Sequence, residues 1–369
     1  MTSHRTQLFK ADQFPHYNHS MISQRIHWHL NIQHFLVDAI SVSCLMGNIR
    51  NGFDMSRREE CIWFVACVVL YNTIAFCTQW LVGFYCDIID NDWALHPLYA
   101  ALLLLGVLIS FWSPVMGIIL IGLGNSLFHI VGGRCVIRHL GECSSRLGLF
   151  VAPGAWGVYC GKSFSCLQIV YCILFMINTA LVLWSLSKRH QESDNTIAKI
   201  KNPELDSKTI LSIVGLILVC IICRAASGSV QLPGSKFASS LAWLPVLFVF
   251  AGKSMGGFIG DRLGIALTGV VALLAGTLLL TLGECETTFL LGQFFMNILM
   301  PLTLFILVKV LPEYPGLAFG LAATVLYPGS LVRIAWNPHL VFSVLSIGSI
   351  VCFGLACFLL DASPRKSNS

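Results

Sequence analysis

Ionisable and amide side chains recur within four of the most apolar stretches of this sequence. They are His34, Asp38, Asn125, His129, Arg224, Gln293 and Asn297. In three of the four stretches they form pairs spaced four residues apart, which places both members of a pair on one face of a helix. A carboxylate and an imidazole can exchange protons, and a guanidinium suits carboxylate or phosphate groups. The residue types therefore indicate a site that handles protons and binds an anionic group.

Each of these side chains also has a purely structural explanation. A charged side chain inside a membrane helix costs about 2.5–3.5 kcal/mol, so it needs a partner or nearby water. His34 and Asp38 could lie near a membrane surface, and Asn125 could join two helices by a hydrogen bond. Arg224 requires either an acidic partner such as Asp38 or an anionic ligand. Recurrence in four separate stretches favours one polar cavity lined by all seven residues.

The elements that would position these residues follow from the composition. Of the 369 residues, 56% are hydrophobic and only 11% are charged, whereas soluble chains contain roughly 25% charged residues. The apolar residues form blocks that extend to the ~20 residues a helix needs to cross a bilayer. The sequence therefore predicts an all-α polytopic membrane protein.

Counting such windows predicts about twelve transmembrane helices. Their centres are Val42, Leu70, Leu104, Leu123, Gly154, Leu174, Leu218, Phe248, Leu273, Leu302, Ala323 and Ile350. A polar segment separates two sets of six, the proportions of a pseudo-symmetric transporter. The predicted parts are a polar N-terminal tail (1–30), an N-terminal six-helix bundle (31–186), a cytoplasmic linker (187–208), a C-terminal six-helix bundle (209–360) and a C-terminal tail (361–369).

Positive charge predicts the orientation of these helices. The linker contains Lys188, Arg189, Lys199, Lys201 and Lys208, and loops rich in Lys and Arg stay in the cytoplasm. We expect a monomeric, multi-pass protein in the lipid bilayer of the cell membrane, with both termini cytoplasmic. The net charge of +5 follows from this bias, so it indicates no nucleic-acid partner.

No cofactor and no metal site is expected from the sequence. The histidines of the first thirty residues, among them His4, His16, His19, His27 and His29, fit no defined ligand spacing, which favours a simple tail. The nucleotide-binding pattern G-x-x-x-x-G-K-[ST] does not occur. Any movement of a solute would therefore draw on an ion gradient rather than on ATP.

A glycine-rich motif lies between the eighth and ninth predicted crossings. It reads GFIGDRLG and contains Gly257, Asp261, Arg262 and Gly264. Glycines permit close helix packing, and the charged residues can brace helix ends. The corresponding loop of the first half reads GFYCD, with Gly83 and Asp87 at the same spacing but without the Arg and the following Gly. The two copies indicate an internal repeat.

This motif resembles the cytoplasmic loop signature of the major facilitator superfamily. LPEYPGLAFG (311–320) is similar to that superfamily's loop into the eleventh helix. GLFVAPGAWG (148–157), with Pro153, Gly154 and Gly157, resembles the fifth-helix motif of its exporters. The resemblance extends over about residues 31–360 and implies two bundles that rock against each other around a central site.

The sequence thus predicts a secondary active transporter, not an enzyme, for a small anionic or zwitterionic organic solute. Asp38 and His129 are predicted to carry a coupling proton, and the helix-5 motif favours efflux. The predicted substrate-binding residues are Arg224, His34, Asn125, Gln293 and Asn297. The predicted gating loops contain Gly83, Asp87, Gly257, Asp261, Arg262 and Gly264.

Two further segments suggest a branch of the superfamily. HFLVDAI, which begins at His34, and GLGNSLFHIVGGR (122–134) are similar to fosmidomycin-resistance exporters. Two alternatives remain at this point. One is a membrane enzyme, such as an acyltransferase that uses His129 with Asn125. The other is a transporter-like sensor that binds its ligand without moving it.

Overall fold

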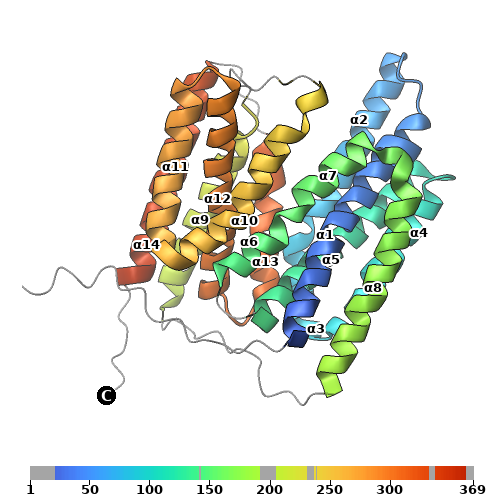
Figure 1. Cartoon of the computed structure of the whole chain (residues 1–369), viewed down its shortest axis with the longest axis horizontal. Coiled ribbons are helices and arrows are strands. Elements are labelled where there is room, and N and C mark those ends of the chain that lie inside the picture. The colour runs from blue at the N-terminus through green and yellow to red at the C-terminus, as the bar shows by residue number, and fades with distance from the viewer. Residues whose placement is uncertain are drawn as a thin grey trace, which may run out of the picture.

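The computed structural model describes residues 21–140, 143–191, 205–230, 237, 239–331 and 337–362, and these form helices joined by short loops (Figure 1). In the N-terminal half the helices are α1 (Met21–Cys44), η1 (Leu45–Ile49), α2 (Arg58–Asn72), η2 (Thr73–Cys77), α3 (Gln79–Ile89), α4 (Asp92–Ile109), α5 (Pro114–Leu140), α6 (Ser144–Val151), α7 (Pro153–Ser163), η3 (Ser165–Leu167) and α8 (Gln168–Gln191). In the C-terminal half they are α9 (Ser207–Ser227), η4 (Ser239–Leu241), α10 (Trp243–Leu263), α11 (Ile265–Leu282), α12 (Glu286–Val310), α13 (Pro315–Leu331) and α14 (Pro338–Ala362).

Several of these helices join end to end, so that each half consists of six rods. The segments α1–η1, α2–η2–α3 and α6–α7 each make one rod, and the described residues form twelve rods. Within the described residues, ten helical stretches are long and apolar enough to cross a membrane. The predicted all-α membrane fold is confirmed, and each predicted crossing corresponds to one rod.

Two rods are interrupted for identifiable reasons. Pro153 separates α6 from α7, since proline has no N–H to donate and its ring clashes with the preceding turn. In the second rod, the π-helical turn η2 lies between α2 and α3. Such turns are short and often mark functional positions. Here Thr324 Oγ1 of α13 donates to Phe76 O at 3.1 Å, so the irregular turn faces the other half.

The outer surfaces of the helices are apolar. Large hydrophobic side chains such as Trp63, Trp112 and Ile169 are exposed, as they would be if lipid surrounded the protein. The side chains that face inward include many polar ones, among them the fully buried Arg134 and Gln33. This inversion of the usual soluble pattern supports the membrane assignment.

The ends of the described chain lie on one side of the bundle. The start of α1, the end of α8, the start of α9 and the end of α14 all lie at the lower end in Figure 1. We call this the linker end. An even number of crossings requires this arrangement, and it agrees with the prediction that both termini share a side.

The structure differs from the predicted boundaries at three places. Helix α1 begins at Met21, whereas the predicted bundle begins at residue 31. The earlier start is explained by packing, because His27 and Leu30 are buried against the bundle and His27 Nε2 lies 3.2 Å from Arg146 O. Residues 187–191 continue α8, and residues 207–208 already belong to α9. Residues 1–20, most of the predicted linker (192–204) and residues 363–369 lie outside the described residues.

Candidate functional site

Four of the predicted site residues meet in the core of the N-terminal half. His34 and Asp38 project from α1, and Asn125 and His129 project from α5. His34 Nε2 lies 3.0 Å from His129 Nε2 and 3.5 Å from an Asp38 carboxylate oxygen. Asn125 Nδ2 donates to Asp38 Oδ1 at 3.1 Å. The interpretation that these side chains share one site is therefore supported, and we call them the His–Asp cluster.

The backbone orients both imidazoles of the cluster. His34 Nδ1 lies 2.6 Å from Phe150 O, and His129 Nδ1 lies 2.9 Å from Asn125 O. A carbonyl oxygen only accepts, so each Nδ1 must donate. In both neutral rings the lone pair is therefore on Nε2, and the two Nε2 atoms face each other beside the carboxylate of Asp38.

The helix-5 glycines create the space for this cluster. A Cβ on Gly154 would lie 2.5 Å from both Asp38 Oδ2 and His34 Nε2, and one on Gly157 would lie 2.3 Å from Phe35 O. Both distances are far below van der Waals contact, so only glycine allows α7 to approach α1 this closely. Pro153 ends α6 just after Phe150, whose carbonyl holds His34. The motif thus shapes the cluster within its own half.

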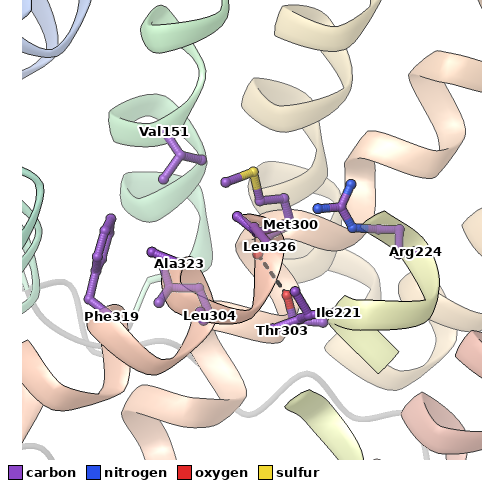
Figure 2. Close-up of a pocket in the computed structure, with 10 residues that line it drawn as sticks. Val151, Ile221, Arg224, Met300, Thr303, Leu304, Phe319, Ala323 and Leu326 are labelled. Atoms are coloured by element: carbon purple, nitrogen blue, oxygen red, sulfur yellow. Dashed lines mark hydrogen bonds between the residues drawn. The ribbon is translucent and has the colours of Figure 1, made fainter. Parts of the chain in front are cut away.

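Arg224 lies in the other half and lines a pocket between the halves. Its guanidinium reaches from α9 toward Met300 of α12, with Val151 of α6 across the pocket (Figure 2). The pocket encloses about 340 Å³ of empty space, part of it open to solvent, and its remaining lining residues are Ile221, Thr303, Leu304, Phe319, Ala322, Ala323 and Leu326. Arg224 is the pocket's only charged side chain in the described part of the chain.

Lys253 of α10 belongs to the same region, although the sequence analysis did not select it. Its ammonium is close enough to Arg224, Asp38 and His129 for their charges to interact. Among the described residues, no ion pair includes Lys253 or Arg224, and Arg224 Nε has no hydrogen-bond partner. A lone lysine within an apolar stretch was the signal that could have identified it.

Two predicted site residues, Gln293 and Asn297, lie on α12. Asn297 Nδ2 donates to Gln293 O of its own helix, α12, at 2.8 Å. Asn297 packs against α10, where a Cβ on Gly252 would lie 3.0 Å from its own Cβ. In the parts of the chain that the structure describes, neither side chain bonds to Arg224 or to the His–Asp cluster. Of the seven predicted residues only Arg224 lines this pocket, and the prediction of one cavity shared by all seven stays a prediction.

The predicted gating aspartates join the two halves at the linker end. Asp261, near the end of α10, accepts hydrogen bonds from Ser144 N at 2.9 Å, Ser144 Oγ at 2.7 Å and Ser145 N at 3.0 Å. Asp87 of α3 accepts from the backbone N–H groups of Gly316 and Leu317, both at 2.9 Å. Each carboxylate therefore caps the N-terminus of a helix in the opposite half, α6 or α13, where the helix dipole favours negative charge.

Glycines bring the same helix pairs into backbone contact. A Cβ on Gly83 would lie 2.2 Å from Gly316 O, and one on Gly257 would lie 2.3 Å from Ser144 O. The two motif copies also end alike, since Gly264 has φ +92° and the equivalent Asp90 has φ 49°. Aspartate is one of the few residues that tolerate this left-handed conformation. Asp90 is therefore the structural equivalent of Gly264 in the first half.

The charged members of these loops differ between the halves. Arg262 is exposed and has no ion pair among the described residues, so the expected brace from this arginine does not form here. In the first half, the fully buried Arg134 of α5 takes that role. It donates to Asp92 and to Cys86 O and lies 3.7 Å from Asp87.

Comparison with known proteins identifies the fold. No family model matches the sequence, and no curated protein matches it. Solved structures do match. FucP, the E. coli fucose:proton symporter, in its outward conformation has a TM-score of 0.61 at 14% identity, covering 89% of this chain and 97% of that chain. The human organic anion transporter MFSD10 has a TM-score of 0.62 at 13% identity, covering 92% and 99%.

A third match is a bacterial homologue of the iron transporter ferroportin in an outward-facing state. Its TM-score is 0.56 at 12% identity, and the alignment covers 91% of this chain and 98% of that chain. All three matches span nearly the whole of both chains. The chain therefore has the fold of the major facilitator superfamily, in agreement with the loop motifs, whereas its branch within the superfamily stays a prediction.

Proposed function

We propose that this protein is a secondary active transporter for a small anionic or zwitterionic organic solute. The observation that carries the proposal is Arg224, which lines the pocket between the halves without an ion pair among the described residues, while the nearby ammonium of Lys253 adds to its positive charge. An uncompensated cation in a membrane interior is costly. A bound anion would supply the missing partner, and the fork of Arg224 suits a carboxylate or phosphate group.

The contacts between the halves support movement by alternating access. Asp87 and Asp261 close the linker end through two equivalent helix caps, which can break together when the halves rock. The structure is thus in a state closed at the linker end. With that end in the cytoplasm of a cell, as the positive charges predict, this state faces outward.

The His–Asp cluster is the proposed coupling site. Its three acceptor groups, His34 Nε2, His129 Nε2 and the Asp38 carboxylate, face one another, so the cluster is satisfied when it holds a cation. A proton is the coupling ion we propose, and one structural neighbour is itself a proton symporter. The Pro153 motif favours export, in which a proton entering the cell drives the solute outward.

The proposal is tested by thermal stability of the purified protein in detergent, screened against organic anions and zwitterions. A ligand present at about 100 times its dissociation constant should stabilise the folded state by roughly 2.7 kcal/mol. Arg224→Ala should abolish the stabilisation, whereas Arg58→Ala, which removes an exposed arginine far from the pocket, should retain it. Hits would then be assayed for movement across proteoliposomes with an imposed pH gradient.

Each outcome bears on the proposal. Pocket-dependent binding with movement driven by the pH gradient would establish both the solute and the coupling ion. Binding without movement would contradict transport and favour the sensor alternative. Transport by Arg224→Ala at the wild-type rate would refute the assigned anion site.

A further inference from the structure

The His–Asp cluster has the geometry of a metal site. His34 Nε2, His129 Nε2 and the Asp38 carboxylate lie within 4.8 Å of one another in the described chain. The separations are 3.0 Å between the two Nε2 atoms, 3.5 Å from His34 Nε2 to Asp38 Oδ2 and 3.9 Å from His129 Nε2 to Asp38 Oδ1. Around a tetrahedral ion with bonds of about 2.0–2.1 Å, neighbouring ligand atoms are about 3.3–3.4 Å apart. The two imidazole nitrogens are already close to this spacing, and the Asp38 carboxylate, whose two oxygens each approach a different imidazole, must turn one oxygen toward both.

The hydrogen bonds around the cluster are those of metal-binding histidines. Each imidazole donates Nδ1–H to a backbone carbonyl, Phe150 O for His34 and Asn125 O for His129. These two hydrogen bonds fix the tautomer that leaves Nε2 free to bind a metal. The carboxylate is held too, by Asn125 Nδ2 at 3.1 Å. All three ligand groups are thus preorganised with their lone pairs directed at one another.

We propose that His34, Asp38 and His129 bind a divalent transition-metal ion. Two imidazoles and one carboxylate suit Zn²⁺, Co²⁺ or Fe²⁺, whereas Mg²⁺ and Ca²⁺ prefer oxygen ligands throughout. Three protein ligands leave a fourth position for water or another ligand, as in open zinc sites. The proposal goes beyond the proposed function, since it does not depend on whether the chain moves a solute.

The surroundings of the site allow an ion to reach it. The Asp38 side chain is the most exposed of the three ligands, at 13%, so an ion would enter from its side, whereas the backbone of Gly154 packs directly against Asp38 Oδ2 and His34 Nε2. Two other groups face the carboxylate, Tyr71 of α2 and Lys253 of α10. Lys253 carries positive charge and opposes a second cation, so its removal should strengthen metal binding.

The test is Co²⁺ binding by the full-length protein in lipid nanodiscs, measured by equilibrium dialysis and by the visible spectrum of the bound ion. The sequence contains 11 His and 15 Cys, so the informative quantity is the difference between variants. We expect His129→Gln and Asp38→Asn each to bind one Co²⁺ fewer per chain and to lose the spectrum of a four-coordinate ion. His96→Gln, which changes a buried histidine of α4 outside the cluster, should bind as the wild type does.

Two further variants change no ligand residue. Gly154→Ala puts a methyl group into the ion's space and should also abolish that equivalent, while Gly215→Ala, whose Cβ meets nothing within 4 Å, should not. Lys253→Met should tighten Co²⁺ binding several-fold, because a nearby positive charge is removed.

X-ray absorption of the wild-type protein with Co²⁺ requires no variant and guards against loss of folding. Imidazole and oxygen ligands in the first shell are expected. The proposal is overturned if the bound ion has thiolate ligands, or if well-folded cluster variants bind as much Co²⁺ as the wild type. It is equally overturned if the wild type binds no Co²⁺ that the cluster variants lose, in which case a proton alone occupies the cluster.

Discussion

The helix cap formed by Asp261 should set how long the halves stay together at the linker end. Asp261→Asn retains one oxygen acceptor but replaces the other with an NH2 group. That group faces the backbone N–H of Ser144 or Ser145, which both donate to the carboxylate in the structure. The substitution leaves the size of the side chain unchanged. It removes the negative charge and at least one hydrogen bond. Because both act on α6 only when the linker end is closed, the substitution destabilises that state alone.

The size of the effect follows from these contacts. A hydrogen bond to a charged group contributes about 1.5–3 kcal/mol, and a charge at a helix N-terminus adds about 0.3–1 kcal/mol. The closed state should therefore lose about 2–4 kcal/mol relative to the open one. Since 1.4 kcal/mol is a factor of ten, the population ratio should shift by roughly 30- to 700-fold toward the open linker end.

Native cysteines report this shift without added labels. Cys143 directly precedes α6 and is half-buried beside the cap, whereas Cys285 is exposed at the opposite end of the bundle. Alkylation of each cysteine would be followed over time by peptide mass spectrometry of the protein in nanodiscs. We expect the rate at Cys143 to rise about tenfold or more in Asp261→Asn, while the rate at Cys285 stays unchanged.

A matched control and a second cap sharpen the test. Glu284→Gln removes an exposed acidic group at the opposite end and should leave the rate at Cys143 as in the wild type. Asp87→Asn breaks the equivalent cap on α13 and should act independently, so the double variant should show the sum of the two free-energy changes. If Asp261→Asn alkylates at Cys143 no faster than Glu284→Gln, the cap does not hold the halves together and the reasoning fails.

Two further predictions concern packing and the cluster. Gly83→Ala would place a Cβ 2.2 Å from Gly316 O, so it should open the linker end as the cap variants do. Gly354→Ala, whose Cβ meets nothing within 4 Å, should leave it closed. The same alkylation assay measures both, and equal rates at Cys143 would contradict the close approach of α3 and α13. Asn125→Ala leaves the buried Asp38 carboxylate without its amide donor and should lower the free energy of unfolding by about 1–3 kcal/mol. Denaturant or thermal unfolding in detergent measures this loss, and an unchanged midpoint would show that the hydrogen bond contributes nothing.

Much of the fold was predictable because it depends on properties that are local in the sequence. Twelve apolar windows, the polar segment after the sixth and the two GxxxD motifs each reflect a requirement met within a few tens of residues. Helical periodicity likewise placed His34 beside Asp38 and Asn125 beside His129, because residues four apart share a face whatever the helix packs against. The same rule could not show which of these faces meet.

The meeting of faces is decided by the packing of all helices together. His34 lies beside His129 because Gly154 and Gly157 let α7 press α1 toward α5, whereas Asn297 of α12 packs against Gly252 of α10. Asp261 finds its partners at Ser144, 117 residues away, a separation no local pattern reports. The sequence by itself therefore determined the membrane helices, their order and the polar residues they carry. Only the tertiary structure decided which of those residues share a site, since that choice depends on interhelical contacts distributed over the entire chain.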